Sequence, residues 1–125
     1  MLIFKIVDSD EWQAAQDIGA YRGSAADKTD GFIHLSTSAQ LAGTLTKHFA
    51  KADNLMLVAI DTDGLSSALK WETSDSGDSY PHLYGDLELS AVKWSCRIPR
   101  KSEGVFALPV QAFMQSGEAP GQRFN

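Results

Sequence analysis

The sequence of 125 residues contains one cysteine, Cys96. A single cysteine excludes an internal disulfide and a thiolate metal cluster, and it is typical of proteins in a reducing cytoplasm. No apolar run approaches the roughly 20 residues that a membrane-spanning helix needs. The start of the sequence shows neither the basic stretch nor the cleavage site of a signal peptide. We therefore expect a cytoplasmic protein that does not contact a membrane.

Positive charge and the usual cofactor motifs are also scarce. Eleven Lys and Arg against 16 Asp and Glu give a formal net charge of −5, which argues against an extended nucleic-acid surface. The phosphate-binding patterns G-x-G-x-x-G and G-x-x-x-x-G-K-[ST] are absent, and the three histidines lack the spacing of metal ligands. We therefore predict no metal and expect a small molecule or nucleotide as the ligand.

The composition is that of an ordinary globular protein, 43% hydrophobic and 22% charged. The length is sufficient for one domain with one core, which we assign to residues 1–114. Residues 115–125 are expected to form a flexible tail. Predicted strands outnumber helices, and the helices come early. This pattern predicts an α+β domain with two main helices and a mostly antiparallel sheet, with a split sheet as the alternative arrangement.

The elements follow from short-range signals. Asp8 and Glu11 have the spacing of a capping box for a helix over residues 10–18, and Gly19 is a stop signal for that helix. Thr37 begins a second helix that extends to about residue 50. Strands are expected at 2–7, 32–35, 55–60, 70–72 and 87–98, a loop at 19–31, a short helical turn at 65–69 and an exposed loop at 73–79.

Residues 30–36, Asp-Gly-Phe-Ile-His-Leu-Ser, join a turn signal to an alternating segment. In an extended chain Ile33 and Leu35 point one way, while His34 and Ser36 point the other with Cα atoms about 6.5 Å apart. Both polar side chains can then contact one ligand, and imidazole acts as donor, acceptor or general base near neutral pH. The alternative is structural, with the histidine bonded to the backbone and the serine starting the next turn.

A second histidine segment occupies residues 80–85, Tyr-Pro-His-Leu-Tyr-Gly. If it is extended, His82 and Tyr84 share the face opposite Leu83. Gly85 permits a sharp exit or the close approach of a ligand. The alternative is an aromatic cluster that stabilises the fold beside a turn.

Three further residues leave alternatives open. Lys5 shares a strand face with Ile3 and Val7, so it either lies at a sheet edge with its stem over apolar surface, which the pattern favours, or points into a site. Glu72 either pairs with such a cation, contacts ribose hydroxyls, or is a solvated carboxylate at a strand end. His48 belongs to an apolar helical stripe and is expected to pack in the core.

Several of these motifs, taken in order, resemble the small bacterial family known as domain of unknown function 952. The resemblance covers about residues 2–98. It depends on Phe4-Lys5-Ile6, Trp12 and Ala15, Tyr21-Arg22-Gly23-Ser24, residues 30–36 with Gln40, Trp71-Glu72, and residues 81–85 followed by Ala91-Val92. The family in turn looks like a compact ADP-ribosyltransferase fold, and the RNA 2′-phosphotransferases that use NAD are similar.

This resemblance implies an NAD-dependent ADP-ribosyl or phosphate-acceptor transferase that breaks the nicotinamide–ribose bond. Glu72 would stabilise the cation-like sugar, His34 and Ser36 would position ribose or phosphate, Tyr84 would stack on nicotinamide, and His82 would contact the acceptor. The implied set comprises Glu72, His34 and His82 as catalytic residues and Lys5, Ser36, Tyr84, Tyr21 and Arg22 as ligand-binding residues.

Lys5 departs from the family pattern, which often has histidine at this position. A lysine donates to a ribose hydroxyl but cannot accept from it, and it adds a charge. This departure supports the alternative function, a non-catalytic module that binds a nucleotide or another anion.

Overall fold

Strands outnumber helices in the described part of the chain, and the α-helices come before most of the strands. The computed structural model describes residues 1–65 and 67–114. The strands are β1 (Leu2–Asp8), β2 (Ala20–Tyr21), β3 (Ile33–His34), β4 (Leu55–Asp61), β5 (Leu69–Thr73), β6 (Ser79–Leu83), β7 (Leu87–Glu88), β8 (Val92–Arg97), β9 (Arg100–Ser102) and β10 (Val105–Phe106). The α-helices are α1 (Ser9–Ile18), α2 (Ala25–Asp30) and α3 (Leu41–His48), and the 3₁₀ helices are η1 (Ser38–Gln40), η2 (Thr62–Gly64), η3 (Leu89–Ala91) and η4 (Val110–Phe113).

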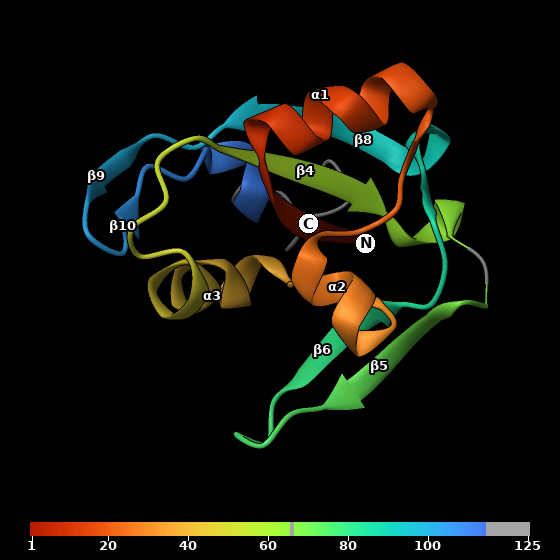
Figure 1. Ribbon diagram of the computed structural model, residues 1–125. Helices are drawn as coiled ribbons and strands as arrows, with labels where there is room; N and C mark the ends of the chain where they lie inside the picture. The colour runs from red at the N-terminus through yellow and green to blue at the C-terminus, as the bar shows by residue number, and fades with distance from the viewer. Residues whose placement is uncertain (66, 115–125) are drawn as a thin grey trace, which may run out of the picture.

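The central sheet has the order β1-β4-β8, and its neighbouring strands are antiparallel. Strand β4 is the middle strand, and the continuous apolar run at 57–60 is fully buried, as a strand covered on both faces requires. Helix α1 covers one face and α3 the other (Figure 1). Alternation along β1 sends Ile3 and Val7 to the α1 side and Phe4 and Ile6 to the α3 side.

A second antiparallel sheet has the order β3-β6-β5. It meets the central sheet at a bridge between Phe4 and Ser36, whose backbones exchange hydrogen bonds of 2.8 and 2.9 Å. Two short pairs, β2–β7 and β9–β10, are antiparallel as well. The predicted α+β class with mostly antiparallel strands is confirmed. No helix in the described part of the chain is long and apolar enough to cross a membrane.

Helix α1 forms where the sequence predicts it. The Asp8 side chain accepts hydrogen bonds from the backbone N–H groups of Asp10 and Glu11, which satisfies two donors of the first turn. The helix ends at Gly19, whose φ of 95° lies in the left-handed region that glycine adopts at little cost. Trp12 is buried on the core-facing side.

The loop predicted at 19–31 is wrong, because this segment contains β2 and α2. Helix α2 is short and lacks an apolar stripe, so periodicity does not reveal it. It is held by a capping box in which Ser24 accepts from the Asp27 N–H and the Asp27 carboxylate accepts from the Ser24 N–H. Gly31, with φ of 87°, ends the helix.

Three other boundaries differ from the predictions. The second predicted helix starts with η1 and ends two residues early, although the capping box at Thr37 is present. The helical turn expected at 65–69 lies earlier in the chain, as η2, and β5 already begins at Leu69; residue 66 of the predicted turn lies outside the described residues. The single strand expected at 87–98 is divided, because β7 pairs with β2 while β8 pairs with β4, and the chain must turn between the two sheets. The predicted tail at 115–125 lies outside the described residues.

Two glycines test how tightly α2 is fitted to the fold. Gly23 has φ of 109°, and a Cβ added there would lie 2.9 Å from the Cβ of Asp27, whereas a Cβ at Gly31 would meet no atom within 4 Å. We expect Gly31→Ala to lower the free energy of unfolding by about 1–2 kcal/mol through backbone strain alone. Gly23→Ala should cost about 1–3 kcal/mol more, because the new methyl group collides with Asp27. Urea denaturation measures both, and equal losses would contradict this account.

Candidate functional site

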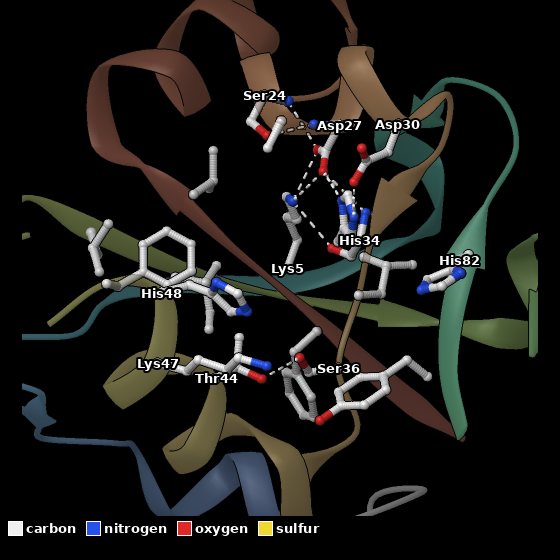
Figure 2. Close-up of a pocket in the computed structure, with 18 of the residues that line it drawn as sticks. Lys5, Ser24, Asp27, Asp30, His34, Ser36, Thr44, Lys47, His48 and His82 are labelled. Atoms are coloured by element: carbon white, nitrogen blue, oxygen red, sulfur yellow. Dashed lines mark hydrogen bonds and ion pairs between the residues drawn. The ribbon is translucent and has the colours of Figure 1, made fainter. Parts of the chain in front are cut away.

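A cleft of about 790 Å³ opens where the two sheets meet. It is bordered by β1, α2, β3, α3 and the β5–β6 hairpin. Figure 2 labels ten polar residues of its wall, which are Lys5, Ser24, Asp27, Asp30, His34, Ser36, Thr44, Lys47, His48 and His82. The other polar residues of the wall are Asp8, Glu11, Tyr21, Ser74, Asp75, Ser76 and Tyr80. Within the described residues, no three His, Cys, Asp or Glu side chains are grouped in a way that could hold a metal ion.

The cleft brings together five of the eight predicted site residues and leaves three outside it. Those in its wall are Lys5, Tyr21, His34, Ser36 and His82. Those outside are Arg22, Glu72 and Tyr84. Arg22 is exposed and lies 3.7 Å from an Asp86 carboxylate oxygen on the surface. Glu72 contacts the ring of His82, and the Tyr84 hydroxyl contacts Glu72.

Lys5 lies on an edge strand of the central sheet, as the favoured interpretation has it, but its ammonium group is buried and does not reach solvent over apolar surface. Its side chain is 6% exposed, and its Nζ lies 2.9 Å from the Oδ2 of Asp27 (Figure 2). The same Nζ donates to the backbone carbonyl of His34 at 3.1 Å. Helix α2 covers this part of β1 and supplies the counter-charge, so the lysine does not have to reach solvent.

Asp27 is the central residue of the site, and the sequence reasoning missed it. Its carboxylate accepts from the backbone N–H of His34 at 3.1 Å and from that of Ser24 at 2.9 Å, in addition to its pair with Lys5. It also lies 2.6 Å from the Nδ1 of His34. The Ser24-x-x-Asp27 spacing of a capping box is the signal that would have located it.

The charges of this buried pair depend on each other. Burial by itself would raise the pKa of Asp27, but attraction to Lys5 and hydrogen bonds from His34 and Ser24 outweigh it, so that the pKa lies below its ordinary value of 3.8. Burial lowers the pKa of Lys5, and the Asp27 charge opposes that change. Asp27 therefore stays ionised at neutral pH and continues to hold Lys5 and His34.

Both ring nitrogens of His34 face carboxylates. Nδ1 lies 2.6 Å from Oδ1 of Asp27, and Nε2 lies 2.9 Å from Oδ2 of Asp30. A neutral imidazole has one N–H, so both contacts are hydrogen bonds when the ring carries both protons. The ring is 39% exposed on the cleft side, and Asp30 is half exposed, so a ligand can displace Asp30 more easily than Asp27.

His82 lies directly opposite His34 across the β3–β6 pair, with ring centroids 5.7 Å apart. Its Nδ1 is 2.7 Å from Oε1 of Glu72, and the Tyr84 hydroxyl donates to the same oxygen at 2.7 Å. These bonds from His82 and then Tyr84 lower the pKa of Glu72. Phe32 stacks on the His82 ring at 4.0 Å, so the aromatic cluster weighed as the structural alternative is also present. Glu72 therefore orients His82.

Tyr21 contributes a buried phenol to the cleft wall. The residue is 3% exposed, and its hydroxyl has no hydrogen-bond partner of ordinary geometry among the described residues. Burial, followed by the negative charges of Asp27 and Glu11, raises its pKa, while the nearby Ser24 hydroxyl acts weakly in the opposite sense. The phenol therefore stays protonated and keeps a donor available.

His48 does not pack in the core, so that prediction is wrong. It is the last residue of α3 and is exposed in the wall of the cleft. The buried residues of the helix are Leu45 and Leu41, one and two turns earlier. The apolar stripe therefore ends before His48, and this histidine joins Lys47 in facing the cleft (Figure 2).

Comparison with known protein families shows which family the chain matches. The family described as Protein of unknown function (DUF952) matches residues 6–95. The chain belongs to this family. The match includes both histidine segments, so the DUF952 resemblance seen in the sequence is confirmed, but the comparisons do not support the further likeness to ADP-ribosyltransferases. No curated protein matches the chain.

Solved structures of a relative agree with this DUF952 assignment. The crystal structure of protein CC0527 from Caulobacter crescentus is 40% identical, has a TM-score of 0.85, and the alignment covers 90% of this chain and 99% of that chain. The crystal structure of its double methionine variant is 39% identical with the same TM-score and coverage. The NMR structure of CC0527 is 40% identical and has a TM-score of 0.74, and the alignment covers 85% of this chain and 90% of that chain. These structures support the family and the fold but name no activity.

Replacing Asp27 tests the buried ion pair. Asp27→Asn leaves Lys5 buried without a counter-charge, so we expect the free energy of unfolding to fall by about 3–5 kcal/mol at neutral pH. Lys28→Gln, an exposed change on the same helix, is the matched control and should shift it by no more than about 0.5 kcal/mol. Urea denaturation measures both. A loss below about 1 kcal/mol for Asp27→Asn would show that the pair does not hold α2 in place.

The same carboxylate predicts an acid-sensitive fold. Because the pKa of Asp27 in the folded state lies below 3.8, its stabilisation is complete above that value and is lost as pH falls through the folded pKa. We expect the free energy of unfolding of the wild type to fall more steeply below about pH 4 than that of Asp27→Asn, so that the two curves converge. Urea denaturation at a series of pH values measures this, and parallel curves would contradict it.

Proposed function

We propose that this DUF952 protein binds a nucleotide in the cleft and transfers its glycosyl group to an acceptor hydroxyl, with NAD as the first candidate donor. The observation that carries the proposal is the pair formed by His34 and His82. The two rings are 5.7 Å apart on neighbouring strands, and each has its Nδ1 within 2.7 Å of a carboxylate oxygen. A carboxylate on Nδ1 sets the orientation and tautomer of an imidazole that handles protons.

His82 has the geometry of a general base. With Nδ1–H donated to Glu72, the lone pair lies on Nε2, which has no hydrogen-bond partner among the described residues. His82 lines the cleft, so Nε2 is the atom that can accept a proton from an acceptor hydroxyl. Phe32 covers the ring and limits its hydration.

The proposed glycosyl transfer breaks one bond to the ribose and forms another. The bond between nicotinamide and the ribose C1′ breaks, and its electron pair leaves with nicotinamide, which becomes neutral. The acceptor oxygen forms the new bond to C1′ and gives its proton to Nε2 of His82. His34, whose ring lies beside that of His82, supplies its Nε2–H to a ribose oxygen that displaces Asp30.

This proposal changes four of the roles that the resemblance implied. Glu72 positions His82 instead of facing the sugar, and Tyr84 supports Glu72 instead of stacking in the cleft. Lys5 offers no free cation to an anion, since its charge is paired with Asp27. Arg22 points to the surface and is left out of the site.

A second candidate is a nucleotide-binding module without catalysis. Two observations favour it. The Asp30 carboxylate lies 2.9 Å from Nε2 of His34, where a ligand would have to bind. Glu72, the carboxylate expected to stabilise a cation-like sugar, lies outside the cleft. Such a module would bind the nucleotide and leave the glycosidic bond intact.

The test measures binding and turnover in the same samples. We expect calorimetry to detect NAD binding and a chromatographic assay to detect nicotinamide release. His82→Gln should lower the rate of release about 100-fold or more, because it removes the general base, while changing NAD affinity by less than about threefold. Arg22→Gln, outside the cleft, is the control and should match the wild type in both measurements.

Three results are distinguishable. NAD binding with release that depends on His82 supports the transferase. Binding without release supports the non-catalytic module. Absence of binding at millimolar NAD, with the protein shown to be folded, would contradict both candidates.

A further inference from the structure

We infer that the α3 wall of the cleft, made by Gly43, Thr44, Lys47 and His48, binds the phosphate groups of the nucleotide. This inference rests on the proposed function and adds to it a subsite and a direction for the ligand. The phosphates would lie against α3, and the reacting ribose would lie toward the His34–His82 pair. Figure 2 shows Lys47, His48 and Thr44 across the cleft from Asp27 and His34.

The distribution of charge in the cleft supports this direction. On the α2 side, the charges are paired with each other, Lys5 with Asp27 and His34 with Asp27 and Asp30. On the α3 side, the Lys47 side chain makes no ion pair or hydrogen bond with any described residue, and helix α3 contains no acidic residue. The cleft wall also contains the carboxylates of Asp8, Glu11 and Asp75. Among the described lining residues, Lys47 is the lysine without an ion pair, so an anionic group gains the most beside α3.

Gly43 is a second and independent observation. It lies inside α3, where glycine weakens a helix relative to alanine. No atom of the described structure comes within 4 Å of a Cβ built there, so no protein neighbour requires the glycine. The residue lines the cleft. The missing side chain leaves open space on the cleft side of the helix, where a phosphate oxygen can approach the wall closely.

A pair of hydroxyl groups lies beside this space. Oγ of Ser36 and Oγ1 of Thr44 are 3.3 Å apart, and either one can donate to the other. Because each hydroxyl has one hydrogen, one donor of the pair stays available to a ligand oxygen. Ser36 is 4% exposed and is held by the bridge to Phe4, so the pair is placed by the junction of the two sheets.

Two effects oppose anion binding here. The cleft wall contains the carboxylates of Asp8, Glu11, Asp30 and Asp75, which repel an anion. Lys47 and His48 are in the last turn of α3, and the carbonyl end of a helix carries about half a negative charge. The full positive charge of Lys47 exceeds this half charge. The Lys47 ammonium group therefore determines the sign of the charge that the α3 wall presents to a ligand.

Charge removal tests the phosphate subsite. Lys47→Gln should weaken NAD binding about tenfold and leave binding of nicotinamide riboside, which lacks the phosphates, within about twofold of the wild type. Lys51→Gln is the matched control, since Lys51 is exposed, three residues past α3, and does not line the cleft. Calorimetry measures all three proteins. Equal effects on both ligands, or no effect on either, would overturn the inference.

A side chain placed in the open space beside Gly43 tests the phosphate subsite without removing charge. Gly43→Leu should raise the melting temperature or leave it unchanged, because leucine favours helix and meets no protein atom near its Cβ. It should nevertheless weaken NAD binding more than tenfold by occupying the phosphate position. NAD binding unchanged in a folded Gly43→Leu protein would contradict the subsite.

If NAD does not bind, the proposed function fails, and inorganic pyrophosphate still tests the subsite. In NMR titrations, pyrophosphate should shift the backbone amides of Gly43, Thr44 and Lys47 in the wild type and not in Lys47→Gln. Shifts elsewhere, or no shifts, would overturn the subsite. If NAD binds but neither Lys47→Gln nor Gly43→Leu changes its affinity, the proposed function stands and the subsite fails.

Discussion

The candidate site depends on one buried ion pair between Lys5 and Asp27, whose nearly inaccessible side chains come from positions 22 residues apart. A buried charge is costly unless it is paired, so α2 has to dock where Asp27 reaches the lysine. The same carboxylate then holds the backbone and the ring of His34. One contact therefore sets the positions of β1, α2 and β3 relative to one another, and with them one side of the cleft.

This arrangement determines the chemistry that the cleft can offer. Because Lys5 and Asp27 neutralise each other, they act as scaffold. The groups presented to a ligand are imidazoles, hydroxyls, the exposed cation of Lys47 and the carboxylates of Asp8, Glu11, Asp30 and Asp75. Glu72 and Tyr84 have a similar supporting role behind His82. Each histidine of the pair is thus oriented by a carboxylate from a different element, and the cross-strand register of β3 and β6 sets the distance between the rings.

Short-range signals predicted the elements whose causes are local. The buried run at 57–60 is the middle strand, and Asp8 and Gly19 bound α1 as their capping signals require. Helix α2 escaped prediction because it has no apolar stripe, and what stabilises it is a capping box and a charge partner on a distant strand. His48 was wrongly assigned to the core for a related reason. Helical spacing does not show where the elements that cover a helix end.

For the site, the sequence by itself determined which side chains share a strand face, because alternation follows from backbone geometry. That placed His34 with Ser36 and gave His82 a face opposite Leu83. Only the tertiary structure decided what these residues contact. Asp27 faces Lys5, Glu72 faces His82, and Arg22 and Tyr84 lie outside the cleft because of how distant elements dock. The partner of a charged side chain depends on that docking, and the spacing of residues along the sequence does not predict it.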